Sequence, residues 1–229
     1  MTGLVRKATM LVACGVLLGA TVAMAGVPSP GNSTSPTRIN LVGFAGSLAD
    51  SGTGGLIGNT ITKVQVIVRD LANNPVAGST VVFDFSSCVT SAGKDVKVSD
   101  TQHYQGLAVA CATKRVTGFS DATGTATFVI EGGGAAGATA HTVGCGKIYA
   151  DNVLLTPGGI GVGMYNLDGL GAVGGADLSL FAADAFSATP NEDRSDYDGS
   201  GTVGGGDLSL FASIVFGSGS LSSGAACLP

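Results

Sequence analysis

Three aspartates surround a glycine-rich turn in the segment SDYDGSGTVGGGDLSLF, residues 195–211. Calcium takes about six to eight oxygen ligands, and a common calcium-binding loop supplies them from positions 1, 3, 5, 7, 9 and 12, with glycine at position 6 for the sharp turn. If Asp196 is position 1, Gly201 falls at position 6. The expected ligands are then Asp196, Asp198, Ser200, Thr202 through its carbonyl, and Asp207, with water at position 9. The alternative is a glycine-rich acidic turn that binds no metal.

The same pattern occurs in a first copy, thirty residues earlier. YNLDGLGAVGGADLSLFAADAF, residues 165–186, aligns with the second copy, and DLSLFA stands at both 177–182 and 207–212. A six-residue repeat in register with acidic loops indicates a duplicated unit. The corresponding ligands are Asn166, Asp168, Ala172 through its carbonyl, and Asp177. Leu170 at position 5 has no ligating side chain, so this loop is expected to bind calcium more weakly, or to be retained only for its packing.

An apolar run follows each loop and predicts a helix. In the second copy we expect the helix to begin at Asp207, with Leu208, Phe211 and Val215 on one apolar face, because residues three to four apart share a side of a helix. Val203, at loop position 8, is expected to pair the two loops.

The two loop–helix units, over residues 165–216, resemble the dockerin module of secreted bacterial proteins, a tandem of EF-hand-like units with Asp rather than Glu at position 12. The resemblance implies calcium-dependent folding and docking onto a partner cohesin domain. Partner choice in that family lies largely at loop positions 10 and 11, often Ser-Thr. Here those positions are Gly175–Ala176 and Gly205–Gly206, which have almost no hydrogen-bonding side chains. Docking of the pair onto the chain's own β-domain, or onto another protein's, is therefore the alternative.

Short strand-like runs alternate with turns before residue 160. VQVIVRD (64–70) places three valines on one face, and STVVFDF (79–85) places Asp84 opposite its apolar residues. Further strands are predicted in KRVTGFS, TATFVIE and HTVGCGKIYADNVLL. About seven short strands with regular turn signals predict an antiparallel β-sandwich.

Two stretches, VRDLANNPVAGSTVVF and SDATGTATFVI, resemble bacterial immunoglobulin-like domains of the invasin/intimin type, over residues 37–157. The resemblance implies a spacer or adhesion module without catalytic residues. We therefore expect a mainly β protein. An Ig-like sandwich would span residues 37–160, a small helical dockerin-like module residues 161–217, and a tail residues 218–229.

The N-terminus has the features of an export signal. A basic start, MTGLVRK, precedes an apolar run and the small-residue site AMA at 23–25. Residues 1–25 are therefore predicted to be a signal peptide, residues 26–36 a flexible linker, and the protein secreted. The rival interpretation is a lipid anchor at Cys14 in LVAC, which would leave an unusually short apolar region.

Four cysteines remain after residue 25, which in an exported protein indicates up to two disulfides. Three connectivities are possible. A bridge between Cys88 and Cys111 is preferred, since it would close a modest loop across a hairpin, and Cys227 is either paired or free.

Charge and composition exclude several classes of function. Without Arg6 and Lys7 the chain keeps 9 basic and 16 acidic residues, and all but one of the charges after residue 160 are acidic. That distribution argues against nucleic acid and towards a cation. A glycosidase needs two carboxylates in a cleft, and Glu131 and Glu192 are the only glutamates. No G-x-S-x-G motif is present, and His103 and His141 are isolated in the sequence.

The sequence thus predicts a secreted, non-catalytic, calcium-binding structural or assembly protein. Its dockerin-like module would attach it to a cohesin-like or surface protein, with no membrane span. The alternative is a carbohydrate-binding accessory protein of an extracellular polysaccharide-degrading system, although the chain lacks Trp.

Overall fold

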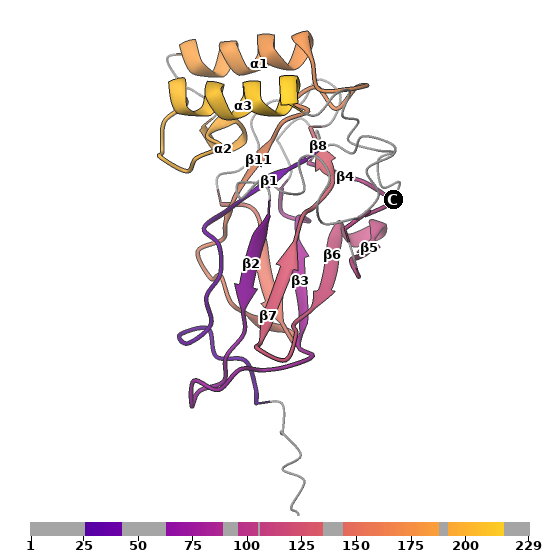
Figure 1. Ribbon diagram of the computed structural model, residues 1–229, viewed down its shortest axis with the longest axis vertical. Coiled ribbons are helices and arrows are strands. Elements are labelled where there is room, and N and C mark those ends of the chain that lie inside the picture. Colours follow the sequence, from indigo (N-terminus) through magenta and orange to yellow (C-terminus); the bar gives the residue numbers. More distant parts are fainter. Residues whose placement is uncertain are drawn as a thin grey trace, which may run out of the picture.

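The computed structural model describes residues 26–42, 63–88, 96–104, 106–134, 144–187 and 192–217. In these ranges the protein is mostly β, with several small sheets and three α-helices, which confirms the β-rich class expected from the sequence (Figure 1). The predicted signal peptide, Cys14, His141, Cys227 and the tail at 218–229 lie outside them.

The largest sheet is antiparallel, with the strand order β10–β9–β3–β6–β5. Its central strand β3 (Thr80–Asp84) pairs with β6 (Arg115–Phe119) and β9 (Lys147–Ala150), and β5 (Ala108–Ala110) and β10 (Val153–Leu154) form the edges. A short 3-10 turn, Cys111–Thr113, joins β5 to β6. Asp151 and Asn152, which close the β9–β10 hairpin, both have positive φ, as a tight two-residue turn requires.

Three strand pairs complete the β-structure. β2 (Val64–Ile67) pairs with β7 (Thr125–Phe128), and β4 (Lys97–Val98) pairs with β8 (Gly132–Gly133). β1 (Arg38–Leu41) runs parallel to β11 (Gly161–Met164). A bridge from Val42 to Glu131 connects β1 to the chain that follows β7.

The buried core is one cluster, with residues from the β2–β7 pair, the five-stranded sheet, β1, β11 and the C-terminal helices. The rings of Phe83 on β3 and Phe128 on β7 meet there, with centroids 4.6 Å apart. The alternation predicted for residues 64–70 and 79–85 is confirmed, because Val66, Phe83 and Phe85 are fully buried. Asp84, on the opposite face, is also buried, and its carboxylate binds the Arg115 guanidinium at 2.8 Å.

The segment 26–36, for which the sequence predicts a flexible linker, pairs with the chain around the end of β2. Thr34 bridges to Ile67 and Pro28 to Asp70, and the Ser29 amide donates to the Arg69 carbonyl at 2.7 Å. The segment therefore lies along the edge of the β2–β7 pair.

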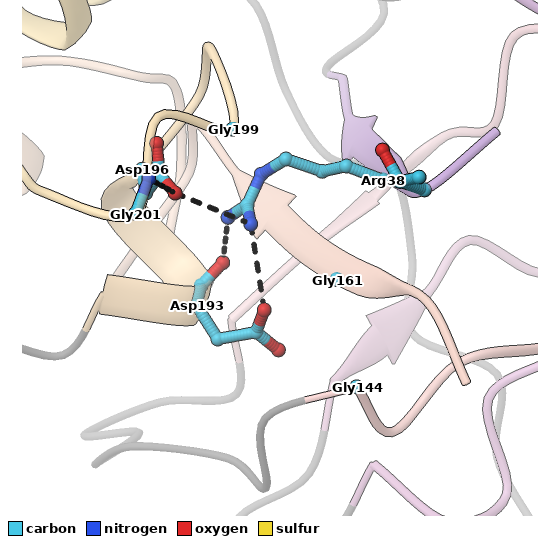
Figure 2. A pocket seen from close by; sticks show the side chains of 8 residues that line it. Arg38, Gly144, Gly161, Asp193, Asp196, Gly199 and Gly201 are labelled. Atoms are coloured by element: carbon cyan, nitrogen blue, oxygen red, sulfur yellow. Dashed lines mark hydrogen bonds and ion pairs between the residues drawn. The ribbon is translucent and has the colours of Figure 1, made fainter. Parts of the chain in front are cut away.

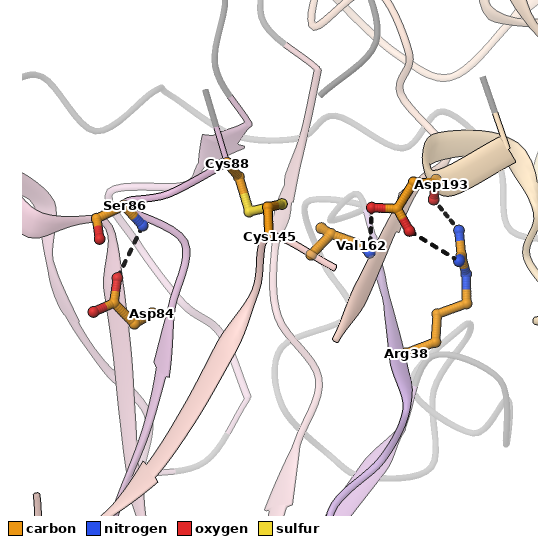
Figure 3. The surroundings of a disulfide bond; sticks show 7 residues. All are labelled: Arg38, Asp84, Ser86, Cys88, Cys145, Val162 and Asp193. Carbon is orange, nitrogen blue, oxygen red and sulfur yellow. Dashed lines mark hydrogen bonds and ion pairs between the residues drawn. A yellow bond between two sulfur atoms is a disulfide. The ribbon is translucent and has the colours of Figure 1, made fainter. Parts of the chain in front are cut away.

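The predicted Cys88–Cys111 bridge is wrong, because Cys88 is bonded to Cys145 (Figure 3). The physical reason is sheet topology. Since β3 and β9 are antiparallel neighbours with Asp84 opposite Lys147, the chain just after β3 meets the chain just before β9. The Cα atoms of the two cysteines are 4.9 Å apart. Cys111 is disulfide-bonded as well, but not to Cys88.

Three helices follow β11 in the described part of the chain: α1 (Gly175–Phe186), α2 (Glu192–Ser195) and α3 (Gly205–Gly217). Figure 1 shows α1 and α3 side by side at one end of the β-structure, with α2 between them and β11. None of the helices within the described ranges is long and apolar enough to cross a membrane.

The helix α3 differs from the prediction in where it begins and in which side chains it buries. The helix begins at Gly205, two residues before Asp207, and Leu208 is 45% exposed. The buried positions are Asp207, Phe211 and Ile214, and Val215 is only partly buried. Phe211 is thus buried as predicted, but the buried positions on either side of it are Asp207 and Ile214 rather than Leu208 and Val215.

Candidate metal centre

The acidic groups of the second loop converge on one point. Carboxylate oxygens of Asp196, Asp198 and Asp207 lie within 4.8 Å of one another. Asp196 and Asp207 are buried, whereas Asp198 is exposed. Three of the five residues expected from the sequence are thus brought together as a set of hard oxygen donors.

Asp207 joins this loop to the start of α3. Its Oδ1 accepts the amides of Tyr197 at 2.6 Å and Asp198 at 3.1 Å, and its Oδ2 accepts the amide of Gly204 at 2.9 Å. The first amides of a helix have no partner within the helix, and a carboxylate in the first turn also interacts favourably with the helix dipole. Asp207 therefore ties the loop to the start of α3.

The rest of the loop folds around the other two aspartates. Asp196 accepts the amides of Ser200 at 3.0 Å and Gly201 at 2.9 Å, and Asp198 accepts the Ser200 amide at 2.9 Å. The Ser200 hydroxyl donates to the Thr202 carbonyl at 3.1 Å, so the two remaining expected ligand oxygens are neighbours. Gly201 has a φ of 85°, a left-handed backbone conformation that residues other than glycine rarely adopt.

The carboxylates differ in how easily they ionise. Burial raises the pKa of Asp196 above its usual value, and the nearby Asp198 and Asp207 carboxyl groups raise it further. Hydrogen bonds from the Ser200 side chain and amide lower the pKa of Asp198. A site that concentrates negative charge in this way favours a bound cation.

Calcium fits the residues that are present. Asp196, Asp198 and Asp207 would hold it through carboxylates, Ser200 through its hydroxyl and Thr202 through its carbonyl. The Asp198 carboxylate lies against the start of α3, where a Cβ at Gly206 would be only 2.7 Å from Asp198 Oδ2. Glycine at this position leaves the carboxylate free to turn into the site.

The first loop repeats the same hydrogen bonds with fewer acids. Asp177 accepts the amides of Leu167 at 2.6 Å, Asp168 at 3.1 Å and Gly174 at 2.8 Å, matching Asp207 contact for contact. Burial raises the pKa of Asp177.

The groups that distinguish the first loop lie at its tip. Asp168 accepts the amide of Leu170, whose side chain is 59% exposed, and Ala172 is exposed too. The Asn166 side-chain amide donates to the Gly171 carbonyl at 3.2 Å, within the loop itself. The loop has the shape of its twin, but two carboxylates rather than three.

Both loops contact the β-structure of their own chain. The sequence left this contact as one alternative and contact with another protein's domain as the other. The Asn40 side-chain amide on β1 donates to the Tyr197 carbonyl at 2.8 Å, and the Tyr197 hydroxyl donates to the Met164 carbonyl at 3.1 Å. In the first loop, the Asn166 carbonyl accepts the Gly134 amide at 2.6 Å. Sequence reasoning missed Asn40, which no metal motif marks.

Arg194, the one basic residue after residue 160, forms a buried ion pair with Asp184. Its guanidinium binds the Asp184 carboxylate through two nitrogens, each at 2.7 Å, and both side chains are buried. The Ser195 hydroxyl donates to the same carboxylate. This pair joins α1 to α2 just before the second loop begins.

His103, which is isolated in the sequence, has a carboxylate neighbour in the structure. Its Nδ1 lies 2.9 Å from both Glu131 oxygens, and its amide donates to the same side chain at 2.7 Å. Burial raises the pKa of Glu131, although hydrogen bonds from His103 oppose the shift.

Comparisons with protein-family models, with curated proteins and with solved structures found no match to this chain.

Proposed function

We propose that this protein is a secreted, non-catalytic calcium-binding protein that takes part in an extracellular or cell-surface assembly. The observation that carries the proposal is the convergence of the Asp196, Asp198 and Asp207 carboxylates within 4.8 Å, around glycines that close the loop. The second loop would bind one calcium ion tightly. The first would bind a second ion more weakly, because Leu170 replaces a ligand.

Calcium would have a structural role, by holding the second loop and α3 in place. The second loop contacts β1 and β11 through Tyr197, and it leads directly into α3. An ion that ties Asp196 and Asp198 to Asp207 would hold α3 in a fixed orientation on the β-structure. Binding to the folded form alone also stabilises that form by mass action.

The β-structure would serve as an Ig-like sandwich that acts as a spacer or adhesion unit. The meeting of Phe83 and Phe128 between the five-stranded sheet and the β2–β7 pair supports a two-layer core. The three C-terminal helices and their loops would form a dockerin-like module on one end of it.

Attachment to a protein partner would use the outer face of α1 and α3. A hollow of about 490 Å³ lies there, lined only by apolar side chains and glycines, including Leu178, Val203 and Leu208. At its rim, Phe186 is 89% exposed. Large apolar side chains gathered on one exposed face are typical of protein interaction sites.

The experiment is a calcium titration of the chain from residue 26. Isothermal titration calorimetry measures the binding, and far-ultraviolet circular dichroism measures thermal stability with and without calcium. We expect saturable heat of binding and higher thermal stability with calcium, with magnesium much less effective. No binding at millimolar calcium would overturn the proposal. Attachment is tested separately, by asking whether partners captured from the source's secretome are lost with chelator and with Leu208→Asp.

A further inference from the structure

We propose that Arg38, on strand β1, determines the calcium affinity of the second loop by holding a fixed positive charge beside Asp196. The inference rests on the proposed function, because it concerns the strength of that calcium site. Arg38 lies 158 residues before Asp196 in the chain and belongs to no metal-binding motif.

The guanidinium lies between two aspartates of the C-terminal region (Figure 2). Its Nη1 is 3.9 Å from Asp196 Oδ2 and 3.4 Å from Asp193 Oδ1, and its Nη2 donates to the Asp193 carbonyl. The side chain of Arg38 is only 13% exposed, so water screens its charge less than it would at an open surface.

Two features of the neighbouring chain hold the guanidinium in this position. Arg38 faces Gly161 in the parallel β1–β11 register, and a Cβ at Gly161 would lie 2.6 Å from Nη1. Asp193 is itself buried, and its second oxygen accepts the Val162 amide at 3.4 Å (Figure 3). The chain at β11 therefore leaves room for the arginine and positions its main partner.

Without calcium, the guanidinium offsets part of the repulsion among the three carboxylates. When a divalent cation binds Asp196, the same charge repels it. The affinity of the loop is thus set below the value that its ligands alone would give. Coupling is reciprocal, so the bound cation must weaken the Arg38–Asp196 attraction by the same free energy. Calcium binding and the contact between the second loop and β1 are linked through this residue.

The test compares calcium affinity in Arg38→Gln with that in the unaltered chain, by calorimetry at low ionic strength. Glutamine keeps a side-chain amide that can reach Asp193 but removes the charge. We expect the affinity to rise by roughly tenfold, the order expected for a unit charge a few ångströms from a divalent ion in a partly hydrated site. Arg38→Lys keeps the charge and should stay within about twofold of the unaltered chain.

Arg69→Gln is the matched control. It removes the same charge from a residue whose guanidinium, within the described part of the chain, binds the Asn73 carbonyl of its own turn, so calcium affinity should not change. An affinity for Arg38→Gln that is equal to or lower than that of the unaltered chain would overturn the inference while leaving the calcium site in place. No binding by the unaltered chain would overturn both.

A second variant keeps the inference testable if Arg38→Gln does not fold. Asp193→Asn retains one oxygen, which can accept from either Arg38 or the Val162 amide, but removes the charge that draws the guanidinium away from Asp196. Calcium affinity should fall by roughly threefold or more. Unchanged affinity in this variant would contradict the role given to Arg38.

Discussion

The rings of Phe181 and Phe211, which occupy the same place in the two DLSLFA copies, lie 5.6 Å apart with their planes inclined by 24°. Tyr197 from the second loop packs on both, with centroids 5.9 Å from Phe181 and 6.2 Å from Phe211. Tyr165, at the start of the first unit, stacks on Tyr197 at 4.4 Å. The duplicated units therefore share one buried aromatic cluster.

Phe211→Ala should strongly destabilise this cluster. Removal of a fully buried phenylalanine ring leaves a cavity and costs about 3–5 kcal/mol. Leu208→Ala, one turn earlier on the same helix, should cost less than about 1 kcal/mol, because Leu208 is 45% exposed. Urea unfolding followed by circular dichroism measures both. Equal losses for the two variants would contradict the burial of Phe211.

Gly206→Ala and Gly205→Ala separate metal binding from helix formation. Both changes favour the helix, by at most about 1 kcal/mol. A Cβ at position 206 would lie 2.7 Å from Asp198 Oδ2, whereas one at position 205 meets nothing within 4 Å. We expect Gly206→Ala to lower calcium affinity by roughly tenfold and Gly205→Ala to leave it unchanged. Calorimetry checks the pair, and equal affinities would argue against Asp198 as a ligand.

The Cys88–Cys145 bridge should stabilise the β-structure. It links residues 57 apart, and loss of a disulfide that closes such a loop costs about 2–4 kcal/mol. The double variant Cys88→Ala/Cys145→Ala should show that loss in denaturant unfolding. Peptide mapping without reductant should recover the two cysteines in one linked product. A product that links Cys88 to Cys111 instead would contradict the observed pairing.

Glu131 should give stability a specific pH dependence. Burial raises its pKa above the usual 4.5 in the folded state, so the folded chain binds a proton at a higher pH than the unfolded chain does. Its contribution to stability therefore grows as pH falls from 7 through the raised pKa and is complete below about 4.5.

Glu131→Gln removes this dependence. The stability of the variant, relative to the unaltered chain, should be higher at pH 7 than at pH 4.5, because only the unaltered chain buries a charge at pH 7. Urea unfolding at the two pH values provides the comparison. If the stability difference between the two proteins does not vary with pH, burial does not raise the pKa of Glu131.

Local patterns in the sequence predicted much of the candidate site. The 30-residue repeat, the glycine at loop position 6 and the acidic spacing identified residues whose carboxylates do converge, because a loop of this length is determined by its own residues. Alternation likewise predicted the burial of Val66 and Val68 and of Phe83 and Phe85.

Long-range relationships could not be predicted. The pairing of Cys88 with Cys145 depends on β3 and β9 being neighbours, which no local pattern encodes. The position of Arg38 beside Asp196 depends on the parallel pairing of β1 with β11 and on the glycine opposite Arg38. Asp207 is buried and accepts the Tyr197 amide, although periodicity assigns an aspartate to the polar face, and its neighbour Leu208 is exposed.

Calcium binding by the second loop is the central claim, and Asp198→Asn tests it most directly. Asp198 is exposed and accepts a single amide, from Ser200, so its loss should change the stability of the calcium-free chain by less than about 0.5 kcal/mol. Calorimetric titration of the chain from residue 26 should show a tight calcium site that Asp198→Asn weakens by at least about tenfold. An unaltered chain that takes up no calcium, or a variant that binds it equally well, would contradict the account.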